Sequence, residues 1–255
     1  MNTDELLDMA SYAGRLLIES GAEIYRVEET MVRLCTSFPE VEDAQSFVTP
    51  TGIMFSITVN KRTYTKILRV HSRGTDLNCI DKINDLSREA SSQRYTIEEL
   101  HDRLHDIASE ERYSFRVTLF FGALSAGGFA VFFGGSLMEA LYCFIIGMFI
   151  KTASWLMEKR GINGFFVNAI AGGLGAIVAL LVHELDPGTD MDILIISSIM
   201  LLVPGLAITN AIRDTVAGDY LSGVARGIEA FLVAIAIAVG IGFVLSMFQT
   251  LSGGM

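Results

Sequence analysis

Residues 204–230, PGLAITNAIRDTVAGDYLSGVARGIEA, place charged side chains between two long apolar segments. The polar groups of interest are Asn210, Arg213, Asp214, Arg226 and Glu229. The flanking apolar segments are long enough to cross a bilayer, so several of these groups are expected at or below the membrane surface. Ionisable residues at that depth are costly and usually serve a pathway or a binding site. This stretch is therefore the leading candidate for function.

The two apolar segments belong to a series that fills residues 114–255. Five segments carry no charge except Lys151 in the second, and they cover residues 117–138, 140–157, 162–182, 193–212 and 230–248. Each is close to the ~20 residues that a helix needs to cross a hydrocarbon core about 30 Å thick. Residues 114–255 are thus predicted to form five transmembrane helices, which makes the chain an α-helical multi-pass membrane protein in contact with the lipid bilayer.

Residues 1–113 differ in composition and are predicted to form a cytoplasmic α+β domain. Residues 1–114 hold 13 of the 19 Lys and Arg and 20 of the 29 Asp and Glu. Apolar residues recur with a helical period at both ends of this part, and β-branched and aromatic residues cluster between them. The expected order is helices over 4–20 and 23–37, strands at 47–49, 53–59 and 63–70, and helices over 76–91 and 96–111.

Composition excludes several classes of function. The net charge of −10 argues against nucleic acid as a partner, because phosphate binding needs a basic surface. The three cysteines lack metal-ligand spacing, and His101 and His105 lie one helical turn apart without a third ligand nearby in sequence. We therefore expect no metal and no cofactor. No nucleophile arrangement typical of hydrolases is present either, so an enzyme is not expected.

The loops between the predicted spans indicate an orientation. Arg112 and Arg116 precede the first span, and residues 158–160 are basic. Residues 183–192 hold four acidic residues and no Lys or Arg, whereas Arg213 follows the fourth span. The basic loops alternate with the others, which predicts a cytoplasmic N-terminus and an outer C-terminus in the cytoplasmic membrane.

Two kinds of role are expected for polar residues in and near the spans. Pro204 and Gly205 should kink or break the fourth helix, because proline removes a backbone donor and clashes with the preceding turn. Broken helices supply the substrate sites of many transporters. The residues assigned to substrate binding are Pro204, Gly205, Asn210, Arg213, Arg226, Lys151 and Asn168, with the arginines suited to a carboxylate. Asp214 and Glu229 are the candidates for proton coupling, if burial raises their pKa values.

A simpler explanation remains open for each of these residues. The proline can be a structural kink, and Asn168 can bond a neighbouring helix. Lys151 can extend its side chain to the cytoplasmic surface. Arg226 and Glu229, three residues apart on one helix, can neutralise each other without any substrate.

Four motifs, in order along the chain, resemble the threonine/serine exporter family. They are GAEIYRVEETM (21–31), FVTPTGI (47–53), NDLSR (84–88) and the stretch 204–230, in which PG, NAIRD, GDY and RGIEA carry the likeness. The resemblance covers nearly the whole chain. It implies secondary export of threonine and serine, driven by the membrane gradient. Some members are associated with export of dicarboxylates such as succinate, so a dicarboxylate is the alternative substrate.

The resemblance also implies a partner. Fused members continue into a second membrane half, whereas split members encode that half as a separate small protein. With five predicted spans before Met255, the chain is expected to be the larger subunit of a split exporter. It would work with a second small membrane subunit, as a homo-oligomer, or both. The alternative from another class is a cytoplasmic enzyme or sensor domain that the spans merely anchor.

Overall fold

The computed structural model describes residues 2–71, 74–110 and 113–252, and within them it is mostly helical with one small sheet. Arg112, which the orientation argument uses, lies outside the described residues. The elements are α1 (Thr3–Glu19), α2 (Ile24–Thr36), β1 (Val41–Thr49), β2 (Gly52–Val59), β3 (Arg62–Arg69), α3 (Leu77–Ser92), α4 (Ile97–Ser109), α5 (Phe115–Phe132), α6 (Leu137–Lys159), α7 (Gly164–Leu185), α8 (Met191–Ile199), α9 (Gly205–Ala217) and α10 (Tyr220–Ser252).

The chain divides into two compact units that do not follow one cut in the sequence. The N-terminal unit comprises residues 1–111 together with 206–228, and the membrane unit comprises residues 112–205 and 229–255. The expected division into 1–113 and 114–255 remains a prediction about domains. The packing nevertheless groups nearly all of α9 and the start of α10 with the N-terminal residues.

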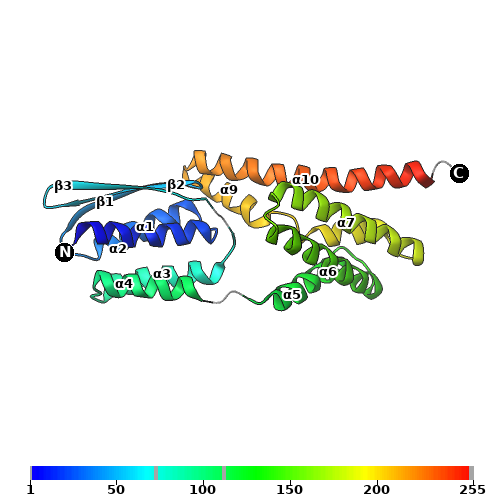
Figure 1. The fold of residues 1–255 in the computed structure, drawn as a ribbon, viewed down its shortest axis with the longest axis horizontal. Helices are drawn as coiled ribbons and strands as arrows, with labels where there is room; N and C mark the ends of the chain where they lie inside the picture. Colours follow the sequence, from blue (N-terminus) through cyan, green and yellow to red (C-terminus); the bar gives the residue numbers. More distant parts are fainter. Residues whose placement is uncertain (1, 72–73, 111–112, 253–255) are drawn as a thin grey trace. The chain divides into compact units, whose positions relative to one another are not determined.

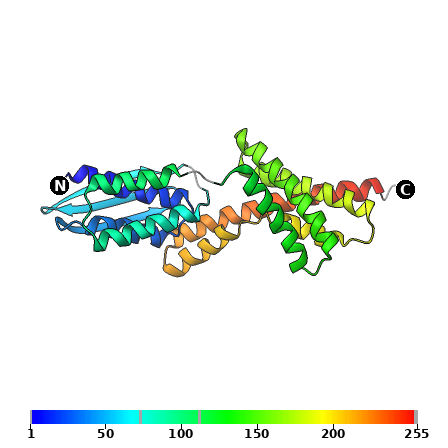
Figure 2. The ribbon, with the colours of Figure 1, turned by 90° about the horizontal axis from the view of Figure 1, so that it is seen from below.

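The N-terminal unit is layered, with the order of helices and strands expected from the sequence. Its strands form an antiparallel meander in the order β1-β2-β3 (Figure 1). Helices α1 and α2 contact one face of this sheet, and α3 and α4 pack on the far side of those two helices. In the view from below, α3 and α4 lie in front of the strands (Figure 2).

Local sequence signals account for the ends of these elements. The β2–β3 turn places Asn60 and Lys61 at φ values of 51° and 60°, the left-handed geometry that joins twisted strands tightly. At the start of α4, Thr96 Oγ1 accepts from the Glu99 amide, and the Glu99 carboxylate accepts from the Thr96 amide at 2.8 Å. This reciprocal pair of hydrogen bonds is a capping box.

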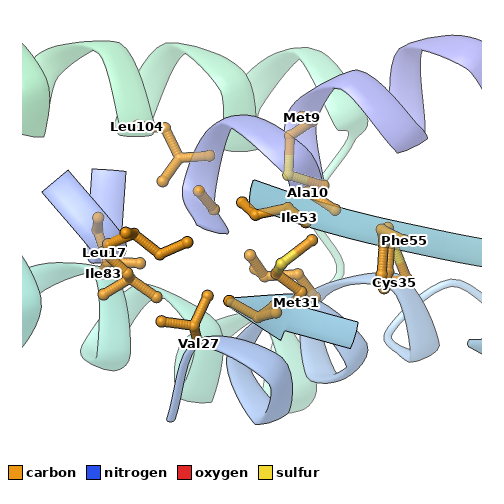
Figure 3. Close-up of a cluster of buried hydrophobic side chains, with 14 of the residues drawn as sticks. Met9, Ala10, Leu17, Val27, Met31, Cys35, Ile53, Phe55, Ile83 and Leu104 are labelled. Atoms are coloured by element: carbon orange, nitrogen blue, oxygen red, sulfur yellow. The ribbon is translucent and has the colours of Figure 1, made fainter. Parts of the chain in front are cut away.

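The core of the N-terminal unit is formed where the helices meet the inner face of the sheet. Leu17, Met31, Phe55 and Ile83 are fully buried there, on α1, α2, β2 and α3 respectively. Figure 3 shows these side chains converging between the strands and the helices. This unit therefore has a hydrophobic core of its own. Burial of one such side chain contributes about 1.5–3 kcal/mol to its stability.

The membrane unit contains the long apolar helices. Within the described residues, α5, α6, α7 and α10 are long and apolar enough to cross a membrane. The segment expected as the fourth span is divided instead between two shorter helices. Helix α8 ends at Ile199 and α9 begins at Gly205, so the break predicted at Pro204–Gly205 is present and begins earlier than predicted.

Helices α7 and α10 approach each other closely at a glycine. A Cβ added at Gly240 of α10 would lie 1.9 Å from the Ala169 carbonyl oxygen of α7, which leaves no room for a methyl group. Gly242 lies two residues later, on nearly the opposite face of α10. A Cβ added at Gly242 would have no neighbouring atom within 4 Å. Small residues allow close contact of this kind in lipid, where hydrophobicity alone does not drive helix association.

These two glycines form a matched test of the α7–α10 contact. Gly240→Ala should lower the midpoint of thermal unfolding of the purified protein in detergent, because the methyl group overpacks a backbone contact, at a cost of at least about 1–3 kcal/mol. Gly242→Ala should change the free energy of unfolding by less than about 0.5 kcal/mol. Equal midpoints for the two variants would contradict this packing.

Candidate functional site

The candidate site is built around the turn between α1 and α2 in the N-terminal unit. Gly21 adopts a φ of +87°, which favours glycine, and a Cβ there would lie 2.8 Å from the Gly74 carbonyl oxygen. The turn leaves the carbonyls of Gly21 and Ala22 and the amide of Ile24 without partners in α1 or α2. These backbone groups are satisfied by residues about 190 to 204 positions later in the chain.

Two side chains from α9 and α10 bind the carbonyls of this turn. Asn210 Nδ2 donates to the Gly21 oxygen at 2.8 Å, and an Arg226 guanidinium nitrogen donates to the Ala22 oxygen at 2.7 Å. Both side chains are buried, with 2% of Asn210 and 8% of Arg226 exposed. A buried carbonyl without a donor is costly, so these two bonds hold α9 and α10 against the turn.

Asp214 of α9 caps the start of α2. The residue preceding α2, Glu23, makes no side-chain capping bond, and Asp214 Oδ1 accepts from the Ile24 amide at 3.1 Å instead. A carboxylate at this position also interacts favourably with the positive end of the helix dipole. Asp214 Oδ2 lies 3.3 Å from Arg226 Nε, so the fully buried carboxylate has a buried cation beside it.

Glu23 forms a second charged group next to the first. Its carboxylate binds Arg26 Nε at 2.8 Å and also pairs with Arg213 of α9. Burial raises the pKa of Glu23, but the hydrogen bonds from Arg26, its own backbone and Arg213 outweigh burial and leave the pKa below its usual range. Glu23 is therefore ionised at neutral pH, and the two carboxylates of the cluster, Glu23 and Asp214, lie among three guanidinium groups.

Asp214 is different, because burial dominates its titration. Burial raises the pKa of Asp214 above its usual range, although the Ile24 amide and the Arg226 charge act in the opposite direction. The buried Asp214 carboxyl group therefore binds a proton more tightly than an exposed aspartate would. A carboxyl group that takes up a proton nearer neutral pH is chemically suited to proton exchange.

Close packing of α9 on α10 positions this cluster. A Cβ at Gly223 would lie 2.1 Å from Thr215 Oγ1 and 2.9 Å from the Ala211 carbonyl oxygen. At Gly227, the partner of Gly223 in a small-xxx-small pair, a Cβ would meet no atom within 4 Å. Only the first glycine of the pair is thus required for the approach that brings Arg226 beside Asp214.

The break before α9 leaves a half-length helix within the membrane unit. Helix α8 has nine residues, which span about 14 Å and roughly half of a hydrocarbon core. It packs against α5, α6 and α7, and Ser197 near its end is fully buried with an Oγ that has no hydrogen-bond partner among the described residues. At its other end, the Asp190 amide donates to the buried Glu139 carboxylate of α6 at 2.6 Å.

The remaining predicted residues Asn168, Lys151 and Glu229 belong to the membrane unit. Asn168 Nδ2 donates to the Gly164 carbonyl of its own helix at 2.8 Å. Lys151 is half-buried and lines a cavity beside α5 in the membrane unit. Glu229 is exposed, and its pairing with Arg226 remains a prediction.

Sequence reasoning identified part of this cluster and missed the rest. Asn210, Arg213, Asp214 and Arg226 were predicted as site residues, and the structure brings these four together. The sequence reasoning missed Glu23 and the backbone groups of the α1–α2 turn. The motif at 21–31 was a signal that this turn mattered, but nothing in it indicated which distant residues the turn would bind.

Comparison with known proteins agrees with the four motifs. The family model ThrE, described as "Putative threonine/serine exporter", matches residues 8–248. The chain belongs to the threonine/serine exporter family. The match includes residues of both compact units.

Individual relatives are distant but match along most of this chain. A "Probable threonine/serine exporter" of Mycobacterium tuberculosis is 22% identical over 94% of the chain and 46% of its own length. The "Threonine/serine exporter" of Corynebacterium glutamicum is 24% identical over 96% of the chain and 52% of its own length. A "Probable succinate transporter subunit YjjP" of Escherichia coli is 23% identical over 92% of the chain and 91% of its own length.

The chain thus spans about half the length of the two exporters and nearly all of the succinate transporter subunit. No solved structure matches it significantly. Family membership together with the apolar helices makes it a multi-pass protein of the cell membrane.

The burial of the cluster predicts unequal effects for its two arginines. Arg226→Met should lower the free energy of unfolding by about 3–5 kcal/mol, because it leaves the Asp214 carboxylate buried without its cation. Arg213→Met should cost about 1 kcal/mol or less, because 56% of the Arg213 side chain is exposed to solvent. Thermal unfolding of both variants in detergent measures the difference, and similar losses would contradict the assigned burial.

Proposed function

We propose that the chain is a subunit of a secondary transporter that exports small carboxylate-bearing metabolites, with threonine and serine as substrates. The observation that carries the proposal is the family match over residues 8–248. Polar groups inside the apolar unit support it further, because a simple membrane anchor would not need a broken helix, a buried unpaired serine or a lysine within a span. The same reasoning favours transport over an anchored enzyme or sensor.

The proposed topology has five crossings, with residues 1–113 cytoplasmic and residues 114–255 in the membrane. The four long helices α5, α6, α7 and α10 support four of the crossings. Residues 193–212 are proposed to supply the other, interrupted between α8 and α9. The basic loops support a cytoplasmic N-terminus and an outer C-terminus. In this arrangement residues 210–219 lie at the cytoplasmic mouth of the transporter.

The residues proposed for transport fall into three groups. Pro204 and Gly205 break the fourth crossing and expose backbone groups. Asn210, Arg213 and Arg226 present donors suited to a carboxylate, and a substrate carboxylate could replace Glu23 on Arg213, the more exposed of the two arginines. Asp214 and Glu229 carry the coupled proton. Lys151 and Asn168 complete the proposed set within the spans.

A second substrate class has support of its own. The chain matches 91% of the length of the Escherichia coli "Probable succinate transporter subunit YjjP" and 89% of its Klebsiella aerogenes counterpart. Both relatives are described as subunits of a succinate transporter, which supports a dicarboxylate exporter of two proteins as the alternative. In this arrangement a second small membrane protein, further copies of this chain, or both complete the transporter.

Counterflow in proteoliposomes tests the function and the substrate together. The purified chain is reconstituted alone and with a candidate second subunit encoded nearby, and vesicles preloaded with unlabelled substrate take up labelled threonine, serine or succinate. We expect counterflow of threonine and serine, and only with the second subunit present. Succinate counterflow without threonine counterflow would support the alternative, and no counterflow of any of the three would reject the transporter proposal.

Proton coupling is tested by neutralising its two proposed carriers. Asp214→Asn and Glu229→Gln keep the shape of each side chain and remove its titration. An imposed pH gradient should accelerate threonine transport by the unaltered protein and lose that effect in the variants, while counterflow without a gradient is retained. Asp85→Asn, on the exposed surface of α3, is the control. Full response to the gradient in both variants would remove these residues from the coupling mechanism.

A further inference from the structure

A cavity lies between the cytoplasmic halves of α5 and α6, as the proposed topology orients them, and of its lining residues only Lys151 has been given a role so far. It has a volume of about 210 Å³, and its lining includes Tyr113, Thr118, Lys151, Ser154, Trp155 and Glu158. A wider groove of about 610 Å³ shares Tyr113, Thr118 and Lys151 with it and continues along α5 past Phe121. All of these residues belong to the membrane unit.

Lys151 is the only charged residue within the apolar part of α6, and it lies eight residues, about 12 Å, before the end of the helix. Its methylene groups lie against α5, where a Cβ at Gly122 would be 3.8 Å from both Cγ and Cδ. Across the described residues, no carboxylate lies within ion-pair distance of its ammonium group. The positive charge is therefore available to an anion that enters the cavity.

Ser154 points to the same conclusion independently. It lies one turn after Lys151 on the same side of α6 and is only 7% exposed. Its Oγ is buried without a hydrogen-bond partner in the part of the chain that the structure describes. A serine hydroxyl inside a helix ordinarily bonds a carbonyl one turn earlier, as Thr152 does to Met148 at 2.7 Å. A buried hydroxyl left unpaired beside a cavity is suited to a polar ligand.

The opposite charge is supplied by Glu158, seven residues after Lys151 and so on the same face of α6. Trp155 also lines the cavity. Its ring packs on Phe115 with centroids 4.4 Å apart, and the Lys159 ammonium lies 5.1 Å from its centroid. Lys159 itself is outside the set of lining residues, so Lys151 is the cation of the cavity.

We propose that this cavity binds a small hydroxyl-bearing α-amino acid as its zwitterion. Lys151 holds the carboxylate, Glu158 holds the ammonium group, and Ser154 bonds a polar group of the ligand between them. The inference rests on the proposed export of threonine and serine, and it adds where and how the substrate is recognised. One cation and one anion match a zwitterion, whereas a dicarboxylate would place its second negative charge beside Glu158.

The single tryptophan of the chain makes binding directly measurable. Trp155 is the only tryptophan in the sequence and lines the cavity, so its emission reports occupancy without interference. The full chain in nanodiscs of phosphatidylcholine is titrated with L-threonine, L-serine and succinate. We expect a saturable change in emission for both amino acids, with succinate binding at least about tenfold more weakly.

Variants of the lining residues then test the assigned contacts. Lys151→Met should weaken amino-acid binding about tenfold or more, and Ser154→Ala about three- to tenfold, as expected for loss of a charged and a neutral hydrogen bond. Arg160→Gln, which removes a positive charge at the end of the same helix outside the cavity, is the matched control and should bind as the unaltered protein does. Unchanged binding in Lys151→Met would overturn the proposal, and Lys151 would then be a residue that merely extends to the membrane surface.

Two further outcomes would also overturn it. An emission change that requires phosphatidylglycerol in the nanodisc, and that amino acids do not produce, would assign the cavity to a lipid phosphate group. Stronger binding of succinate than of threonine would reject the zwitterion. Counterflow separates this site from the transport function itself: normal threonine counterflow in Lys151→Met rejects the site and keeps the function, whereas threonine binding without counterflow keeps the site and rejects the function.

Discussion

The Asp214 carboxylate accepts a hydrogen bond from the first amide of α2 while it lies beside the Arg226 guanidinium, and the arrangement of the N-terminal unit depends on this contact. A buried carboxylate is tolerated only with donors around it, so α9, α10 and the α1–α2 turn must come together for any of them to be stable there. Asn210 and Arg226 complete the contact by binding the two carbonyls of the turn. Residues that the sequence places between membrane spans thus become part of a soluble-type core.

The membrane unit is governed by a different constraint, which is the fate of backbone groups without water. Helix α8 stops after nine residues and leaves its last carbonyls within a bundle of three other helices. Such a stop is tolerated only where protein surrounds it. At Gly240, α10 approaches the backbone of α7 too closely for any side chain to lie between them. Close packing and a broken helix together leave polar groups, among them Ser197 and Ser154, inside an apolar unit.

Charge is distributed differently in the two places where a substrate could bind. In the cluster at the α1–α2 turn, both carboxylates are already paired with arginines, so a ligand must displace an internal partner. In the α5–α6 cavity, the ammonium of Lys151 has no carboxylate partner among the described residues, so a ligand carboxylate could pair with it without displacing another group. The first is suited to a contact that opens and closes, and the second to binding.

Composition and periodicity determined the two-part character of the chain, the order of the N-terminal elements and the long apolar helices, because each follows from local physical preferences: helical period, β-branched clusters and uncharged length. The motif at 204–230 also identified Asn210, Arg213, Asp214 and Arg226. Only the tertiary structure decided what those residues touch. The backbone groups that Asp214 and Arg226 bind lie about 190 to 204 positions away. Backbone amides and carbonyls are the same in almost every residue, so the sequence does not indicate which of them will be bound. The cavity at Lys151 could not be predicted from the sequence either. The direction of the Lys151 side chain and the lack of a hydrogen-bond partner for Ser154 Oγ depend on how α5 and α6 pack.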